Sequence, residues 1–208
     1  MENALPGIIA ELKTVPETLA PDVEGWTAPK VRKLLNRLVA KLPAGESYLE
    51  IGCFQGASLI SALLDYLQAR AIACDNWSEQ PEHRPEEKFW ANLKKYEARI
   101  PKVAVYKQDC FTLPERKPFD CPVGVYFYDG NHNFESQLKA ITMFTPFLAK
   151  RCVVLVDDWN WDRVRDGTWQ GIDEIRPNHV SYWELPSKGN GDFENYWNGI
   201  GAFYMELR

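Results

Sequence analysis

Short apolar runs alternate with amphipathic segments along most of the chain. Five runs rich in aliphatic and aromatic residues predict buried β-strands at residues 48–51, 69–74, 103–106, 123–128 and 152–156. Apolar residues recur at helical spacing at 31–42, 56–64, 85–96, 133–148 and, more briefly, 172–175. In the 31–42 helix the basic side chains, Arg32 among them, are expected on the solvated face. Strands that alternate with helices indicate a parallel, doubly wound α/β sheet with helices on both faces.

The two ends of the chain depart from this alternation. Residues 1–28 are poorly periodic and rich in proline, so we expect an N-terminal extension with at most a short helix near residues 8–12. The remaining residues, 29–208, are expected to form one domain. The apolar runs at 180–185 and 200–207 have no helix between them, so they are predicted to pair as a C-terminal β-hairpin after the five parallel strands.

Composition narrows the classes of function. At 208 residues the chain can bury a sizeable core without disulfides or metals. Its net charge of −5 argues against a nucleic-acid partner held through a broad basic face. The five cysteines include no CxxC pair, so we expect no zinc site or disulfide framework and a reducing, cytoplasmic location. No apolar run approaches 18 residues, so no membrane partner is expected, whereas a homo-oligomer stays open.

A glycine turn follows the first predicted strand. Glu50 ends the strand, Gly52 and Gly56 stand four residues apart, and Ser58 lies at the start of the next helix. Gly52 permits a positive φ, and Gly56 permits close approach of the backbone to a ligand or a neighbouring strand. Ser58 is expected to cap the helix or, more weakly, to contact a ligand. The spacing differs from the dinucleotide pattern G-x-G-x-x-G, because Phe54 occupies the place of the second glycine.

An acidic residue stands at or just past the end of every predicted parallel strand. In a parallel sheet these ends share one edge, where ligands of open α/β sheets bind. Turns also favour Asp, so any single acid could be structural. A shared ligand site is predicted at the edge formed by Glu50, Asp75, Asp109, Asp129 and Asp157.

Two short segments supply candidate chemistry. Asp129-Gly130-Asn131-His132 follows the fourth strand, and Asp157-Asp158 follows the fifth. Adjacent carboxylates repel one another unless a cation or donor neutralises them, and carboxylate oxygens suit Mg²⁺. His132 is a candidate general base. The alternative is structural: Asp129 and His132 would cap the next helix, and one of the paired acids would face solvent.

Together these motifs resemble the class I S-adenosylmethionine-dependent methyltransferases. The resemblance extends over roughly residues 22–160. Within the superfamily, the chain most resembles the small-molecule O-methyltransferases related to cephalosporin-type and macrolide sugar enzymes. It implies a Rossmann-like methyltransferase fold and S-adenosylmethionine as cofactor, with a small-molecule acceptor. The resemblance rests on the following residues: Gly25-Trp26, Glu50-Ile51-Gly52 with Gly56 and Ser58, Asp75, Phe89, Asn92, Asp109, Asp129-Gly130-Asn131-His132 and Asp157-Asp158.

The resemblance also assigns roles to individual residues. The cofactor-binding set is Glu50, Gly52, Gly56, Ser58, Asp75 and Asp109, in which Asp75 accepts the two ribose hydroxyls and Asp109 the adenine amino group. The catalytic set is His132, Asp129 and Asp157. Metal-dependent relatives hold a divalent ion through acids after strands 4 and 5, which implies Mg²⁺ on Asp129, Asp157 and Asp158. Catechol-type relatives have an amide in the place of Asp158, and their base lysine has no counterpart here.

Four of the eight tryptophans follow the fifth strand or lie between the last two apolar runs. Trp159, Trp161, Trp169 and Trp197 are expected near the same edge, as a flat wall for an aromatic or sugar-like acceptor or as packing of the surrounding loops.

The leading function is methyl transfer to a hydroxyl oxygen. One alternative is a non-catalytic S-adenosylmethionine-binding module that acts as a partner or regulator. The other is a nicotinamide-dependent oxidoreductase, which Phe54 disfavours.

Overall fold

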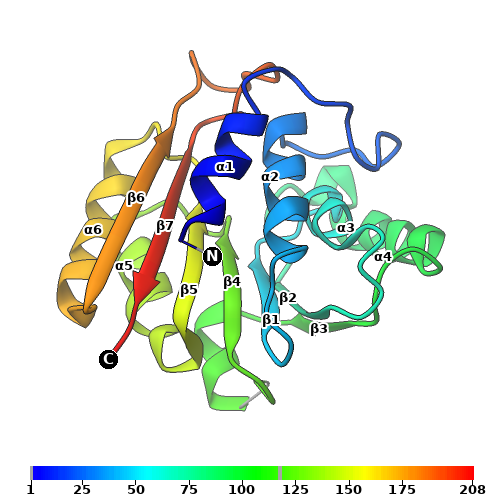
Figure 1. The fold of residues 1–208 in the computed structure, drawn as a ribbon. Helices are drawn as coiled ribbons and strands as arrows, with labels where there is room; N and C mark the ends of the chain where they lie inside the picture. Colours follow the sequence, from blue (N-terminus) through cyan, green and yellow to red (C-terminus); the bar gives the residue numbers. More distant parts are fainter. Residues whose placement is uncertain (1, 117–118) are drawn as a thin grey trace.

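A single mixed sheet forms the centre of the computed structural model, which describes residues 2–116 and 119–208 (Figure 1). Its strands lie in the order β3-β2-β1-β4-β5-β7-β6. The strands are β1 Ser47–Ile51, β2 Arg70–Asp75, β3 Val103–Lys107, β4 Val123–Tyr128, β5 Leu148–Val156, β6 His179–Leu185 and β7 Ile200–Glu206. The α-helices are α1 Ala4–Glu11, α2 Pro29–Val39, α3 Ala57–Leu63, α4 Pro85–Tyr96, α5 Phe134–Thr142 and α6 Asp162–Ile175. Three short 3₁₀ helices are at Pro81–His83, Cys110–Arg116 and Thr145–Phe147.

The strand pairing confirms the predicted fold class. Strands β1 to β5 are parallel, β7 pairs antiparallel with β5, and β6 pairs antiparallel with β7. This is the doubly wound α/β arrangement with a C-terminal hairpin. Because the chain order reverses between β1 and β4, the carboxyl ends of these central strands open onto a crevice.

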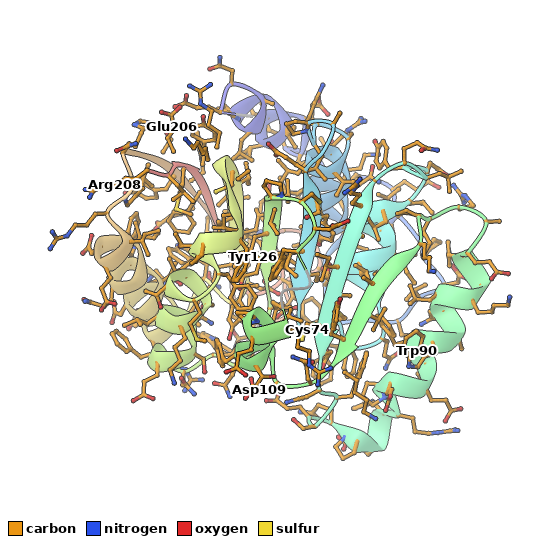
Figure 2. All side chains as sticks on the ribbon, turned by 90° about the horizontal axis from the view of Figure 1, so that it is seen from below. Cys74, Trp90, Asp109, Tyr126, Glu206 and Arg208 are labelled. Carbon is orange, nitrogen blue, oxygen red and sulfur yellow. The ribbon has the colours of Figure 1, made fainter. Side chains whose placement is uncertain are left out.

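Alternate residues of the central strands serve two hydrophobic cores on opposite faces of the sheet. Tyr48 of β1 belongs to the core under α1 to α4, whereas its neighbour Leu49 belongs to the core under α5 and α6. Tyr126 of β4 is fully buried in the second core and lies near the middle of the sheet in Figure 2, with Trp90 on the peripheral helix α4. The central strands β1 and β4 are buried along their whole length, which is why they are apolar, whereas the edge strand β3 is partly exposed.

Helix α6 is the largest difference from the sequence expectation. It runs from Asp162 to Ile175, whereas the sequence pattern predicts a helix only at 172–175. Its interior glycines, Gly167 and Gly171, weaken helix propensity. Both glycines face α5 at close range. A Cβ on Gly167 would lie 2.3 Å from the carbonyl oxygen of Phe134, and one on Gly171 would lie 2.8 Å from the Cβ of Ile141. Close packing of α5 on α6 therefore outweighs the local propensity.

The predicted helix at 133–148 is too long. Helix α5 ends at Thr142, a 3₁₀ turn contains Pro146, and β5 already begins at Leu148. Proline cannot donate the helical hydrogen bond and restricts the residue before it, so the α-helix stops early.

Arg32 does not face solvent as predicted. It is buried on α2, and its guanidinium donates hydrogen bonds to the carbonyl oxygens of Leu19, Ala20 and Val23 at 2.9–3.1 Å. These bonds attach the irregular segment before α2 to the domain, and Leu5 and Ile8 of α1 pack into the same core. The division between an extension at 1–28 and a domain at 29–208 stays a prediction. Within the described residues, no helix has the length and apolar character that crossing a membrane requires.

Candidate functional site

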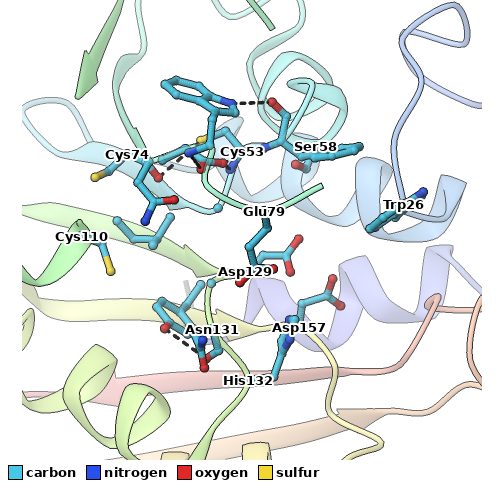
Figure 3. Close-up of a pocket in the computed structure, with 18 of the residues that line it drawn as sticks. Trp26, Cys53, Ser58, Cys74, Glu79, Cys110, Asp129, Asn131, His132 and Asp157 are labelled. Atoms are coloured by element: carbon cyan, nitrogen blue, oxygen red, sulfur yellow. Dashed lines mark hydrogen bonds between the residues drawn. The ribbon is translucent and has the colours of Figure 1, made fainter. Parts of the chain in front are cut away.

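A cavity of about 720 Å³ lies at the carboxyl ends of the central strands (Figure 3). Its walls come from the segments that follow β1, β2, β3, β4 and β5, together with residues 25–27 and the loop between β6 and β7. Glu50 and Gly56 are not among its lining residues. The other eight predicted site residues line it: Gly52, Ser58, Asp75, Asp109, Asp129, His132, Asp157 and Asp158.

The glycine turn is held by Asp75. Gly52 has φ +81°, and Asp75 Oδ2 accepts hydrogen bonds from the N–H groups of Cys53 at 2.7 Å and Phe54 at 2.9 Å. Asp75 Oδ1 accepts a third, from the N–H of Trp77 at 2.7 Å. A carboxylate offers about four lone-pair positions, so these bonds leave Asp75 limited capacity for further donors. Asp75 thus links the turn after β1 to the turn after β2 while lining the cavity.

Glu50 lies beneath the turn and is fully buried. Its carboxylate accepts hydrogen bonds from the Ser58 hydroxyl at 2.6 Å and from the Tyr48 hydroxyl. Burial raises the pKa of Glu50 to about 7, although both hydrogen bonds lower it. Ser58 was expected to cap α3, but its hydroxyl instead donates to Glu50, and no side chain caps this helix at Gly56. The pair therefore braces the turn from inside the domain.

Asp109 stands at the end of the cavity where β3 terminates. Its carboxylate accepts a hydrogen bond from the N–H of Phe111 at 2.9 Å, as a turn Asp commonly does, and the residue also lines the cavity. The Lys139 ammonium from α5 lies 5.9 Å from the centre of the Phe111 ring. In Figure 3, Cys74 and Cys110 mark this end, Trp26 marks the opposite end, and Asp129 and His132 lie between them.

Three acids and one histidine meet between the two ends. His132 Nε2 lies 2.6 Å from Asp158 Oδ2, and Asn198 donates to Asp158 Oδ1 at 2.5 Å. Burial, together with the neighbouring carboxylates, raises the pKa of Asp129 and Asp157 well above the ordinary range. Asp157 is 4% exposed, and its Oδ1 is buried with no hydrogen-bond partner among the described residues.

The structural alternative for Asp129 and His132 does not hold. The helix after them, α5, is capped by Asn133, whose side-chain oxygen accepts the N–H of Ser136 at 2.7 Å. Asp129 and His132 therefore do not cap α5, and both line the cavity.

The grouping of possible metal ligands differs from the predicted set. Ligand atoms of Asp129, His132 and Asp158 all lie within 4.8 Å of one another, whereas Asp157 is not in this group. Two carboxylates and an imidazole suit a divalent transition ion as well as a hard cation. The unpartnered oxygen of Asp157 beside them indicates that the site has room for additional positive charge or a hydrogen-bond donor.

Only two of the four singled-out tryptophans line the cavity. Trp161, edge-on to the His132 ring at 5.0 Å between centroids, and Trp197 do so. Trp159 is buried against Phe203, and Trp169 packs on Tyr182 and Phe203 over the hairpin.

Trp26, Phe54 and Asn198 are among the site residues to which the sequence assigns no role. Trp26 lines the cavity and stacks on Phe54, with ring centroids 4.9 Å apart. Gly25-Trp26 belongs to the motifs of the resemblance, which gives the pair no function, and Phe54 bears only on the exclusion of a dinucleotide. Asn198 had no usable signal, because its partner Asp158 lies 40 residues away in the sequence.

Comparisons with known proteins agree with this geometry. The profile of a methyltransferase-domain family matches residues 49–159, which is more than half of the chain. The matched segment begins within β1 and ends just after β5, so it contains the end of β1, all of β2 to β5 and most of the cavity lining. A search of curated proteins gives no match.

Solved structures share the fold at low sequence identity. The O-methyltransferase from Bacillus cereus in complex with S-adenosylhomocysteine is 15% identical with a TM-score of 0.62, over 98% of this chain and 91% of that one. TomG from Streptomyces achromogenes, an O-methyltransferase involved in tomaymycin synthesis and solved with S-adenosylmethionine, is 19% identical with a TM-score of 0.58, over 98% and 88%. PaMTH1 from Podospora anserina, solved with S-adenosylhomocysteine, is 15% identical with a TM-score of 0.57, over 97% and 87%.

These likenesses establish the arrangement of strands and helices, and the family profile establishes kinship over the segment that builds the cavity. The narrower likeness to cephalosporin-type and macrolide sugar enzymes stays a prediction. With its glycine turn, its acids at the strand ends and this family match, the chain belongs to the S-adenosylmethionine-dependent methyltransferase family.

Proposed function

We propose that this protein transfers a methyl group from S-adenosylmethionine to a hydroxyl oxygen of a small molecule. The observation that carries the proposal is the paired His132 and Asp158, 2.6 Å apart in the cavity that the glycine turn lines. A module that only binds the cofactor needs the turn and Asp75, but it does not need an oriented histidine in the same cavity.

The residues present fit S-adenosylmethionine. The cavity volume falls within the usual range for ligand sites, and its lining carries acids that suit a cationic ligand. The buried, unpartnered Asp157 Oδ1 is an acceptor that such a ligand would satisfy. When bound, S-adenosylmethionine supplies an electrophilic methyl group. The turn at Gly52, together with Asp75 and Asp109, would hold it, and such positioning can contribute up to roughly 7–11 kcal/mol for well-oriented reactants.

His132 is the candidate general base. Asp158 pairs with Nε2, so the carboxylate stabilises the tautomer that carries its proton on Nε2 and leaves Nδ1 as the acceptor. Nδ1 would accept the proton of an acceptor hydroxyl whose hydrogen points at it, while the C–O bond to the methyl group would form as the C–S bond of the cofactor breaks and S-adenosylhomocysteine leaves. Asp158 then stabilises the imidazolium that forms, and Trp161 limits the motion of the ring from its edge.

A divalent cation is the alternative way to activate the hydroxyl. Asp129, Asp158 and His132 would hold it, and it would lower the pKa of the acceptor hydroxyl. The two roles of His132 exclude each other, because an imidazole nitrogen that binds a metal cannot accept the proton. The direct contact of His132 with Asp158 favours the base.

Calorimetric titration with S-adenosylhomocysteine and with NAD tests the cofactor. We expect S-adenosylhomocysteine to bind and NAD not to bind, and the reverse result would contradict the proposal. Asp75→Asn keeps an oxygen for the turn N–H groups but removes the charge, so it should weaken S-adenosylhomocysteine binding about tenfold, the effect of losing about 1.4 kcal/mol from a charge-assisted hydrogen bond.

A second measurement separates catalysis from binding, and the base from the metal. The assay follows transfer of the radiolabelled methyl group from S-adenosylmethionine to phenolic and alcoholic acceptors, with and without excess chelator. Full activity in chelator, lost in His132→Ala, supports the base. Activity abolished by chelator and restored by Mg²⁺ would assign activation to the metal, and binding of S-adenosylhomocysteine with no transfer to any acceptor would support the non-catalytic module.

A further inference from the structure

The cavity has two chemically different ends. One end lies beyond β2 and β3, where Asp75 and Asp109 are placed for the cofactor and where Lys139 lies over Phe111. The other end lies past the Asp129 and His132 segment, on the side of Trp26 in Figure 3. An acceptor must reach His132 from this second end, because the cofactor occupies the first.

Aromatic side chains from three distant segments line the second end. Trp26 precedes α2, Trp161 immediately precedes α6, and Trp197 belongs to the loop between β6 and β7. Trp26 is 49% exposed, and its ring is stacked on Phe54 with an interplanar angle of 26°. Exposed indole faces in a concave site are typical binding surfaces for flat rings, including the apolar faces of sugars.

Three acids and His132 border this end. Asp129, Asp157 and Asp158 line the cavity between its two ends, and the buried Oδ1 of Asp157 has no hydrogen-bond partner among the described residues. Across the described part of the chain, Lys139 is the sole lysine or arginine that lines the cavity, and it lies at the cofactor end.

Two arginines follow Trp161 in the first turn of α6, and each already has partners. The Arg163 guanidinium stacks on Trp161 at 5.1 Å, and Arg165 donates to the Trp159 carbonyl at 2.7 Å and pairs with Asp162. Neither lines the cavity. A carboxylate or phosphate on the acceptor would therefore lie beside these acids with no cationic side chain to pair with it, whereas an ammonium group or a neutral ring needs no such partner.

From these features we propose that the acceptor is a neutral or positively charged molecule that carries its hydroxyl on a flat ring, and that Trp26, Trp161 and Trp197 bind this ring. The inference rests on the proposed function, because it assumes that the cofactor occupies the Asp75 end. It excludes acidic acceptors, such as hydroxybenzoates, nucleotides and other phosphate esters.

Three probes that share a 4-hydroxyphenyl ring and differ in charge test the inference: tyramine, a cation; tyrosol, neutral; and 4-hydroxyphenylacetate, an anion. Each is titrated calorimetrically into the full-length protein saturated with S-adenosylhomocysteine. We expect tyramine and tyrosol to bind at least tenfold more tightly than 4-hydroxyphenylacetate, and added salt to reduce the preference for tyramine. Equal binding of the three probes, tightest binding of the anion, or no binding of any of them would overturn the inference.

Variants test the role of the aromatic walls. Trp197→Ala and Trp26→Ala should each weaken tyrosol binding about fivefold or more and leave the affinity for S-adenosylhomocysteine within twofold of wild type. Trp90→Ala is the matched control, because Trp90 is 47% exposed on α4 and does not line the cavity, so it should change neither affinity. Unchanged tyrosol binding in both wall variants would refute the assignment. Failure of S-adenosylhomocysteine to bind the wild type would instead refute the proposed function itself.

Discussion

Substitution of Gly52 by alanine should be far more damaging than its backbone angle alone implies. A Cβ on Gly52 would lie 1.9 Å from the carbonyl oxygen of Asp129, where ordinary contacts are longer than 3.0 Å. The two strand ends would have to separate by about 1 Å or more. That separation strains the hydrogen bonds from Asp129 N–H to the Ile51 carbonyl, 2.9 Å, and from Gly52 N–H to the Cys74 carbonyl, 3.0 Å.

The expected loss of stability follows from two contributions. An alanine at φ +81° costs about 1–2 kcal/mol. Loss of two backbone hydrogen bonds adds about 0.5–1.5 kcal/mol each. Together they lower the free energy of unfolding by about 2–5 kcal/mol, a large share of the ~5–15 kcal/mol typical of a domain.

Gly45 is a matched control. It has φ +88°, and a Cβ there would meet nothing within 4 Å. Gly45→Ala therefore carries only the backbone penalty of about 1–2 kcal/mol. Urea denaturation followed by tryptophan fluorescence, with comparison of midpoints at constant m, measures both variants. Calorimetry with S-adenosylhomocysteine should show weakened binding for Gly52→Ala alone. Equal losses of stability in the two variants would refute the steric argument.

Three further predictions concern groups whose role is visible only in the folded chain. Arg32→Met leaves three carbonyl oxygens without their charged donor, so the free energy of unfolding measured in urea should fall by about 3–5 kcal/mol. Arg37→Met, on the exposed face of α2, should change this free energy little. Equal effects of the two substitutions would contradict the anchoring role of Arg32. Burial raises the pKa of Glu50 to about 7 in the folded state, whereas the unfolded chain releases this proton near pH 4.5. The protonated side chain therefore stabilises the fold at low pH. Its contribution to the free energy of unfolding falls by about 3 kcal/mol as the pH rises from about 4.5 to 7. Glu50→Gln should therefore lose less stability than wild type over this interval in urea titrations at several pH values, and an unchanged pH slope would disprove the assignment. Asn198→Ala removes the donor that orients Asp158, so kcat with the most tightly bound probe as acceptor should fall about 10–100-fold, with S-adenosylhomocysteine binding preserved; a change in KM alone would argue against a positioning role.

Local pattern was sufficient for the sheet and for the edge where the site lies. Apolar runs of strand length, each followed by an acid, required only the period of a strand and the preference of turns for Asp, and a parallel sheet then brings Asp75, Asp109 and Asp129 to one edge. The glycine turn was predictable for the same reason, since the positive φ of Gly52 is a property of three or four neighbouring residues.

Contacts between distant segments decided the rest. Gly167 and Gly171 lower the local helix propensity, but their lack of a side chain lets α5 approach α6 closely. Packing between the two helices therefore stabilises α6 in the folded protein. Arg32 has the sequence context of a solvated residue, and it is buried because three carbonyl groups of an irregular segment need a donor. The pairing of His132 with Asp158, and of Asp158 with Asn198, depends on side-chain directions at the ends of separate strands and loops. Periodicity carries no information about those directions, so only the tertiary structure determines which of the predicted acids act together.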